Sequence, residues 1–237
     1  MTVRFQSPKV NSVARALALR HHSEDRPGLI GEALALRGYQ VDVAMMDART
    51  ASPSLEGYDL LVILGSKSAV YDHEVEAAWF GRELELIGDA ERRGLAVLGI
   101  CFGAQALCVY HGGEVTLATE GEIGWYEIDI VNGSALSKGP WFEYHFDRCT
   151  LPPGATLWAT TASAVQAFSV GHHVGVQFHP ELDHEQLRDW LTVGDEEARE
   201  VGIDVADLIA RTERETPAAR ERALELVDLF LAHVGVH

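Results

Sequence analysis

The stretch LAVLGICFGAQ (residues 95–105) decides the fold class of this chain, because it leads a buried strand directly into a helix. Leu95–Ile100 is an uninterrupted apolar run, which is typical of a parallel strand covered on both faces. A helix is predicted to follow over Gly103–His111. The turn between them has the pattern G-x-C-x-G, whose glycines permit a tight bend that lifts the Cys101 side chain clear of the sheet.

The same alternation of short apolar runs and helical periodicity extends through the N-terminal half, which indicates repeated βα units. We therefore expect an α/β fold with a mostly parallel sheet and helices on both faces. The predicted strands here are Ala14–Leu19, Tyr39–Met46 and Asp59–Leu64, the predicted helices are Leu29–Arg37 and Glu74–Arg93, and His21–Pro27 is a predicted loop.

The pattern changes after residue 114, where short strand-like runs are separated by turn residues, and again after Pro180, where it becomes helical. We expect residues 1–182 to form one α/β domain and residues 183–237 to form a helical C-terminal extension packed on it. The predicted strands are Trp125–Val131, Thr156–Thr160, Val165–Ser169 and Val174–Phe178, and the predicted helices are Glu185–Thr192, Glu196–Arg211 and Pro217–Val234.

Composition limits the class of protein. The chain has 237 residues, of which 47% are hydrophobic and 23% charged, as in an ordinary globular protein. No window approaches the roughly 18 apolar residues of a membrane-spanning helix, and basic residues interrupt the N-terminal segment where a signal peptide would be apolar. The three cysteines show no CxxC spacing, which fits a reducing compartment, so we expect a cytoplasmic protein without membrane contact.

The net charge of the chain limits the classes of molecule that it can bind. The chain carries 19 Lys and Arg against 36 Asp and Glu, a formal net charge of −17. Binding to nucleic acid depends on clustered cations that displace counterions, and such clusters are missing from this sequence. We therefore expect no nucleic-acid partner.

Cys101 is the candidate nucleophile. The helix that begins after it directs free N–H groups and the positive end of its dipole at the sulfur, which stabilises a thiolate. The N–H of Phe102 would supply half of an oxyanion hole. The competing interpretation is a small core residue, as most free cysteines are, but the elbow pattern favours the nucleophile. Cys108 lies within the predicted helix and is assigned to the core, and Cys149 is assigned no role.

A cysteine nucleophile needs a base, and His179 has the matching context. It follows an apolar strand and precedes Pro180, which cannot extend a strand ladder, so its side chain projects at the carboxyl end of the strand. Glu181 can turn back to orient the imidazole, which gives the triad Cys101, His179 and Glu181. The histidine pairs 21–22 and 172–173 are predicted to be solvated loop residues, and without metal-ligand spacing we predict neither a metal nor a cofactor.

Two motifs together identify a family resemblance. GICFGAQ (residues 99–105) and GVQFHPE (residues 175–181), with cysteine and histidine 78 residues apart (179 minus 101), closely resemble the class I, triad-type glutamine amidotransferase domain in its GMP-synthase-like branch. The likeness covers roughly residues 13–182. It implies a flavodoxin-like sheet, a γ-glutamyl thioester on Cys101 and release of ammonia from glutamine.

The resemblance also implies further site residues. The segment Ile63–Asp72 is similar to the Gly-Gly-Pro loop of the family, so a backbone N–H of Gly65 or Ser66 would supply the second oxyanion donor. Ser66 and Lys67 stand where the family often has Gly and Pro, and Lys67 puts a cation beside the mouth of the site. Gln105 matches a position that contacts the amino-acid end of the substrate, and His145 belongs to a matching His-x-Asp motif, so both are candidate substrate-binding residues.

Three functions remain open at this stage. The chain is a stand-alone amidotransferase that frees ammonia from glutamine for a separate synthetase, since no synthetase segment is recognised in it. Alternatively, it is a γ-glutamyl hydrolase or peptidase that acts on a γ-glutamyl conjugate without a partner. The third reading is a scaffold whose acidic tail docks another protein, which the intact triad disfavours. Glutamate release should rise with a synthetase in the first case, whereas in the second a conjugate should be cleaved faster than glutamine.

Overall fold

The computed structural model describes residues 13–193, 196–200 and 202–235. A single large sheet forms its centre, in the order β2-β1-β3-β4-β10-β9-β8-β6. The first five of these strands run parallel and the last three pair antiparallel, which confirms the mostly parallel sheet. In this order the strands are Tyr39–Met45, Ala14–Arg20, Leu60–Ile63, Ala96–Ile100, His173–Val176, Val165–Val170, Thr156–Thr160 and Asp129–Ile130.

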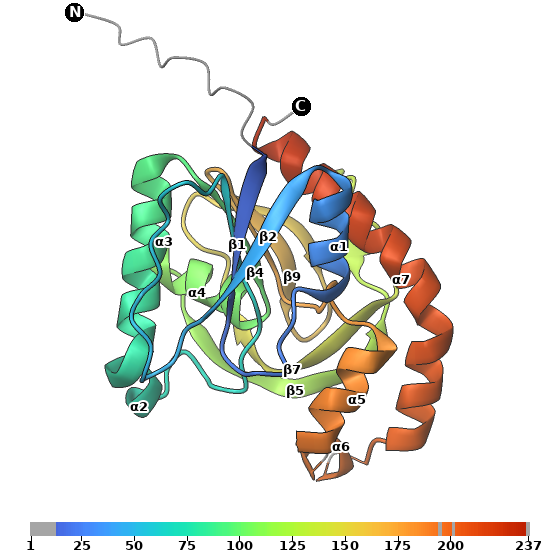
Figure 1. The fold of residues 1–237 in the computed structure, drawn as a ribbon. Coiled ribbons are helices and arrows are strands. Elements are labelled where there is room, and N and C mark those ends of the chain that lie inside the picture. The colour runs from blue at the N-terminus through green and yellow to red at the C-terminus, as the bar shows by residue number, and fades with distance from the viewer. Residues whose placement is uncertain (1–12, 194–195, 201, 236–237) are drawn as a thin grey trace, which may run out of the picture.

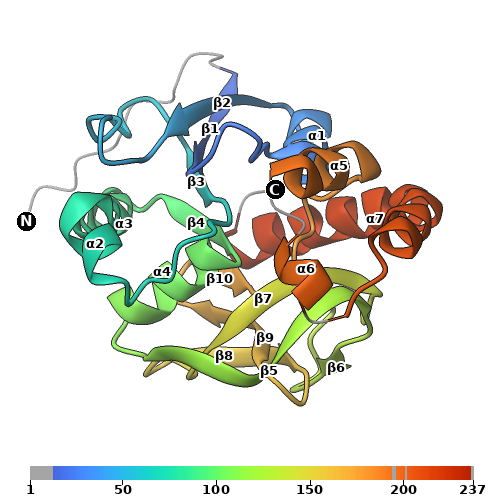
Figure 2. The same ribbon diagram turned by 90° about the horizontal axis from the view of Figure 1, so that it is seen from below.

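Helices cover both faces of this sheet, as expected for an α/β fold (Figures 1 and 2). One face carries α3 (Gly81–Arg93) and α4 (Phe102–Tyr110), and the other carries α1 (Gly28–Leu36), α5 (His184–Val193) and α7 (Val205–His233). Every residue of β3 and β4 is buried, which explains why these two strands have continuous apolar sequences.

The predicted helix Glu74–Arg93 is divided into three pieces. It begins as α2 (His73–Val75), continues as a π-helical segment, η1 (Glu76–Phe80), and becomes regular in α3. Gly94 ends α3 in the left-handed conformation at φ 72°, as a glycine at this position allows.

A second, two-stranded sheet corrects the predicted strand Trp125–Val131. It consists of β5 (Val115–Tyr126) and β7 (Trp141–Cys149), which pair antiparallel, and β7 was missed entirely. The sequence of β7 hides its strand character because it buries the charged residues Glu143 and His145 where apolar side chains are expected. Their mutual pairing allows this burial.

The C-terminal helices also differ from the prediction. Instead of Glu196–Arg211 and Pro217–Val234, the structure has a short α6 (Glu196–Glu200) and one long α7. Asp204 begins α7, because its carboxylate accepts hydrogen bonds from the N–H groups of Ala206 and Asp207. Pro217 lies inside the helix without ending it. The predicted helix start at Pro217 is therefore wrong, because α7 continues through the proline and buries residues on both sides of it.

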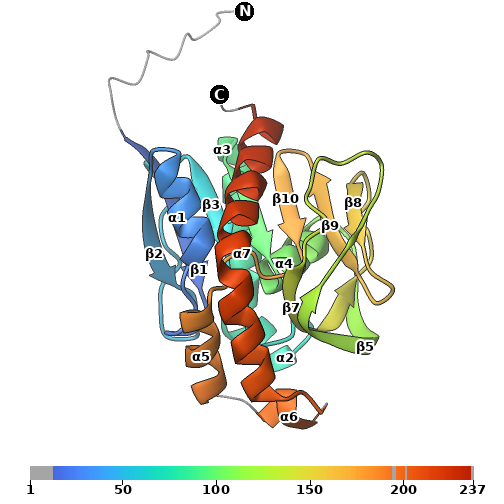
Figure 3. The same ribbon diagram turned by 90° about the vertical axis from the view of Figure 1, so that its right-hand side faces the viewer.

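Packing of α7 joins the extension to the sheet. The helix runs along α1 and across the face of the sheet (Figures 1 and 3). Its side chains Leu226, Val227 and Phe230 are buried in the same core cluster as residues of α1 and of the central strands. The separation of residues 1–182 from 183–237 stays a prediction, but the described part of the tail shares its core with the sheet. Within the described residues, no helix combines the length and apolarity needed to cross a bilayer.

Candidate active site

Cys101 lies at the turn from β4 into α4 in a strained backbone conformation, with φ 50° and ψ −105°. Its N–H donates to the carbonyl oxygen of Val176 on the neighbouring strand β10, at 2.8 Å. The glycines of the motif are needed for close packing: a Cβ on Gly99 would lie 2.4 Å from the carbonyl oxygen of Gly103, and one on Gly103 would lie 2.2 Å from that of Ile63. The elbow therefore exists because two backbones approach where no side chain fits.

Three adjacent strands bring Cys101 and His179 of the predicted triad together with Gly65 of the predicted oxyanion loop. Cys101 follows β4, His179 follows β10 and Gly65 follows β3, and these strands are neighbours in the sheet. A Cβ on Gly65 would lie 3.0 Å from Cε1 of His179 and 3.7 Å from Cβ of Cys101. The side chains thus meet at the carboxyl edge of the sheet, which is where open α/β sheets bind ligands.

Glu181 holds the imidazole of His179. Its Oε1 lies 2.7 Å from Nδ1, and both side chains are buried. The carboxylate accepts the Nδ1 proton, so Nε2 is left for the sulfur of Cys101. Burial opposes protonation of His179, but the Glu181 carboxylate and Cys101 outweigh it and raise the pKa of His179 well above its usual value. His179 is thereby prepared to hold a proton taken from the thiol.

Of the three residues predicted for the oxyanion hole, two line the same cavity as Cys101 and the third, Phe102, follows Cys101 in the chain. Gly65 and Ser66 line the cavity above Cys101. Phe102 turns its ring away into an aromatic cluster with Trp79 and Phe80, at centroid distances of 5.3 and 5.5 Å. Only the main chain of Phe102 remains at the site, and as the first residue of α4 its N–H has no acceptor within the helix.

The predicted substrate-binding residues Gln105, Lys67 and His145 also line this cavity. Gln105 donates from Nε2 to Oε1 of Gln177 at 3.2 Å, and Gln177 donates to Sγ of Cys101 at 3.4 Å. Sequence reasoning missed Gln177, although it lies inside the GVQFHPE motif, two residues before the histidine. The cavity is lined by Asp25, Gly65, Ser66, Lys67, Ser68, Cys101, Gln105, Tyr144, His145, Phe146, Asp147, His179 and Trp190.

The side chain of His145 is buried and carries a positive charge. Its Nδ1 lies 2.8 Å from the carbonyl oxygen of Asp147, and its Nε2 lies 3.0 Å from Glu122 and 3.3 Å from Glu143. The oxygens of Asp147 and Glu122 accept hydrogen bonds, so both ring nitrogens donate, and Glu143 adds an ion pair. Burial opposes this charge, but the two carboxylates prevail and raise the pKa of His145 to about 10. Burial raises the pKa of Glu143 to about 7.

Trp190 is a second residue that sequence reasoning missed. It belongs to α5 in the C-terminal extension, and its ring meets that of His179 edge to face, with centroids 5.0 Å apart and an interplanar angle of 75°. The indole covers the imidazole and lines the cavity. The only signal in the sequence was an aromatic residue in an amphipathic helix, which does not say what that residue faces.

Two histidines contradict the prediction of solvated loop pairs. The side chain of His21 is 2% exposed, and it lies beside Glu83 rather than in water. His173 is also buried and opens β10. Both were misjudged because a buried imidazole needs only one or two polar partners, and these come from distant parts of the chain. Cys108 is fully buried, as predicted for a core residue.

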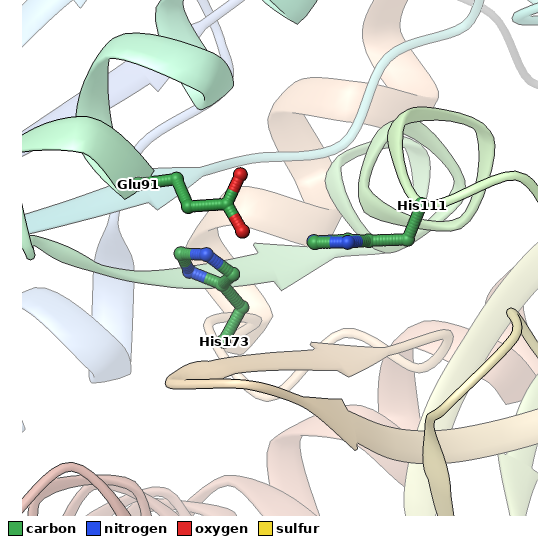
Figure 4. Close-up of side chains that lie close together, drawn as sticks. All are labelled: Glu91, His111 and His173. Carbon is green, nitrogen blue, oxygen red and sulfur yellow. The ribbon is translucent and has the colours of Figure 1, made fainter.

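One group of potential metal ligands lies outside the site. Glu91, His111 and His173 place a ligand atom each within 4.8 Å of one another, with the carboxylate between the two rings (Figure 4). However, Nδ1 of His173 accepts the N–H of Val97 at 3.1 Å, which puts the ring proton on Nε2. Burial and neighbouring His111 lower the pKa of His173 to about 4, so the ring is neutral with no lone pair left for a metal.

The other group consists of Glu122, Glu143 and His145. Because both ring nitrogens of His145 donate protons, this imidazolium has no lone pair for a metal either. We assign a metal ion to neither group, and the expected lack of a metal and of a cofactor stays a prediction.

Comparisons with known proteins agree with this geometry. Residues 28–191 match the family Glutamine amidotransferase class-I. A GMP synthase (glutamine-hydrolyzing) from Bordetella avium is 33% identical over 159 residues, which are 58% of this chain and 28% of that protein. The chain therefore spans less than a third of the length of the curated relatives it matches.

Solved structures extend the likeness to almost the whole chain. A glutamine amidotransferase from Thermotoga maritima is 27% identical, with a TM-score of 0.82 over 95% of this chain and 100% of that one. A second, from Methylobacillus flagellatus, shares the fold at 23% identity, with a TM-score of 0.81 over 94% of this chain and 96% of that one. Because the family match covers residues 28–191 of 237 and its two motifs meet in one cavity, this chain belongs to the class I glutamine amidotransferase family.

Proposed function

We propose that this protein hydrolyses the γ-amide of glutamine through a thioester on Cys101 and releases glutamate and ammonia. The observation that carries this proposal is that Cys101 and His179 line one cavity at the ends of neighbouring strands, with Glu181 hydrogen-bonded to His179 behind them. The protein's membership of the class I family supports the choice of an amide substrate.

The first half of the reaction forms the thioester. His179 takes the proton of the Cys101 thiol, and the sulfur attacks the γ-carbonyl carbon, so an S–C bond forms and the carbonyl oxygen becomes an oxyanion. The N–H of Phe102 and one N–H of the Gly65–Ser66 loop stabilise that oxyanion. His179 then returns its proton to the departing nitrogen, the C–N bond breaks and ammonia leaves.

The second half regenerates the enzyme. Water enters the position that ammonia has left, and His179 removes one of its protons as the oxygen attacks the thioester carbonyl. The S–C bond breaks, glutamate leaves and the proton returns to the sulfur. Throughout, Glu181 keeps the imidazole oriented and stabilises its positive charge.

Ammonia released at such a site is useful to the cell when an acceptor substrate takes it up. The curated relatives are GMP synthases, and the region matched here is 28% of the length of one of them. We propose that a separate synthetase, which supplies the activated acceptor, is the partner of this chain, and that both work in the cytoplasm. The acidic surface implied by the net charge of −17 argues against a nucleic-acid partner.

The test is glutamate release from L-glutamine by the purified protein, measured beside Cys101→Ala, with a γ-glutamyl anilide as second substrate. Cys108→Ala is the matched control, because it removes a buried thiol from the same helix without touching the cavity. We expect release from glutamine that Cys101→Ala abolishes and Cys108→Ala retains. Cleavage of the anilide but not of glutamine would instead identify a γ-glutamyl hydrolase, and Cys101-independent release would contradict the mechanism.

A further inference from the structure

A buried ion pair lies behind the loop that carries the oxyanion donor. Nδ1 of His21 is 2.8 Å from the carbonyl oxygen of Gly65, and Nε2 is 2.7 Å from Oε2 of Glu83. The two side chains are 2% and 0% exposed. His21 follows β1 and Glu83 belongs to α3, so the pair connects two distant segments through the Gly65 loop.

The partners of His21 fix its protonation state. A carbonyl oxygen and a carboxylate oxygen can only accept, so both ring nitrogens must donate and the ring is an imidazolium. Burial opposes that charge, but the Glu83 carboxylate outweighs it and raises the pKa of His21. The ring packs against both Trp79 and Phe102, at centroid distances of 4.7 and 5.0 Å, so it has little freedom to reorient.

The hydrogen bond to Gly65 determines where the next N–H points. In a trans peptide the carbonyl of one residue and the N–H of the following residue point in opposite directions, and the Gly65–Ser66 bond is trans. The Gly65 carbonyl is directed at His21, inside the aromatic cluster. The N–H of Ser66 is therefore directed away from that cluster, toward the cavity that Gly65 and Ser66 line. Among the residues that the structure describes, this N–H has no hydrogen-bond acceptor.

We propose that His21 and Glu83 are positioning residues that lock the Gly65–Ser66 peptide so that the Ser66 N–H serves as the second oxyanion donor. The inference rests on the proposed thioester chemistry and extends it by naming the donor and the groups that hold it. A donor fixed before the reaction stabilises developing charge without reorganisation, which is why its support matters to the rate. The buried imidazolium supplies a stronger hydrogen bond to the peptide than a neutral ring would.

The experiment compares two reagents that attack the same sulfur. Acylation of Cys101 by p-nitrophenyl acetate passes through an oxyanion, whereas alkylation by iodoacetamide does not. Neither reagent requires glutamine or a synthetase. The ratio of the two rates therefore reports on the oxyanion hole even if glutamine is not the substrate.

The main variant combines His21→Phe with Glu83→Met. It keeps an aromatic ring packed against Trp79 and Phe102. It also removes both charges together, because a buried Glu83 carboxylate left without its partner would destabilise the fold. Glu83→Gln is the rescue variant: its amide N–H can donate to Nε2 of a neutral His21, which still donates from Nδ1 to Gly65. His111→Phe is the matched control, since it replaces a partly buried histidine far from the cavity.

In the folded double variant we expect acylation to fall about 10²-fold, the loss typical of an oxyanion donor, while alkylation stays unchanged. Glu83→Gln and His111→Phe should keep both rates. If the double variant acylates normally, or if both rates fall together, the inference is wrong. It is also wrong if the wild-type sulfur is alkylated but never acylated. Wild-type protein that leaves glutamine intact, yet shows the predicted ratio, would overturn the proposed function and leave this inference standing.

Discussion

Gly28 and Glu181 touch backbone to backbone, although 153 positions separate them (181 minus 28). A Cβ on Gly28 would lie 2.0 Å from the carbonyl oxygen of Glu181, and the same oxygen accepts the N–H of Leu29 at 2.9 Å. The first turn of α1 therefore holds the residue that contacts the imidazole of His179. Glycine is needed at position 28 for two reasons: its φ of 43° is unfavourable for other residues, and a Cβ would collide with the Glu181 carbonyl.

Gly28→Ala should consequently impair activity as well as stability. The new methyl group must displace the Glu181 backbone, which moves the carboxylate away from His179. Gly38→Ala is the matched control, because Gly38 also has a positive φ, of 84°, but no atom lies within 4 Å of its Cβ position. Both variants should lose about 1 kcal/mol of unfolding free energy to backbone strain. Only Gly28→Ala should lower kcat for glutamate release, and equal kcat in the two variants would show that the contact is irrelevant to the site.

Glu181→Gln should shift the pH dependence of the reaction. In the wild type the carboxylate supports the imidazolium and so helps to raise the pKa of His179. The amide of glutamine can still accept the Nδ1 proton but carries no charge, so the pKa of His179 falls. Release of ammonia needs the imidazolium, and activity is therefore lost at a lower pH on the alkaline side.

The measurement for this variant is kcat/KM for glutamate release across neutral and alkaline pH. We expect the alkaline limb to move to lower pH, with a maximal rate about 10²-fold or more below wild type. An alkaline limb that stays in place would show that it reports a group other than His179.

His145→Gln should remove a pH-dependent part of the stability. The pKa of His145 is about 10 in the folded chain and about 6.5 in an unfolded one, so its contribution is complete below pH about 6.5 and is lost as the pH rises toward 10. Glu143, with a pKa of about 7, has finished titrating above pH about 8.

The free energy of unfolding in urea, compared between pH about 8 and about 10, isolates His145 from that neighbour. Wild-type protein should lose more stability over this interval than His145→Gln does, while His172→Gln, which changes an exposed histidine, should follow the wild type. Parallel slopes for all three proteins would refute the buried imidazolium.

Phe230→Ala tests whether the C-terminal extension is part of the core. Phe230 of α7 is fully buried, so its truncation should lower the unfolding free energy by about 3–5 kcal/mol. Leu36→Ala, at a side chain that is 70% exposed, should change it by no more than about 0.5 kcal/mol. A small effect of Phe230→Ala in urea denaturation would mean that the tail is dispensable for the fold.

Local patterns were sufficient where one physical requirement dominates a short segment. The runs that became β3 and β4 are apolar at every position because both faces of these strands are covered. The elbow at Cys101 can be recognised in the sequence because only glycine fits at positions 99 and 103 beside it. By contrast, β7 carries Glu143 and His145 on its buried side, and no rule of alternation recognises a strand whose charges pair with each other and with Glu122 of β5.

The sequence-based prediction of where α7 begins is wrong for a related reason. Pro217 is a strong local signal for a helix start, yet the helix passes through it because residues on both sides, Thr212 and Phe230 among them, are buried. Local propensity was outweighed by packing that involves residues far away in the chain.

The sequence by itself determined the α/β class, the nucleophile elbow and the pairing of Cys101 with His179, because each follows from a residue type at a fixed distance from a strand end. Three contacts were decided only by the tertiary structure. His21 and Glu83 lie behind the Gly65 peptide, and Trp190 covers His179. The backbone of Gly28 packs against that of Glu181. These contacts join segments that are far apart in the sequence and meet only on folding. The residue types alone do not reveal such contacts, because their roles depend on distances that only the folded structure sets.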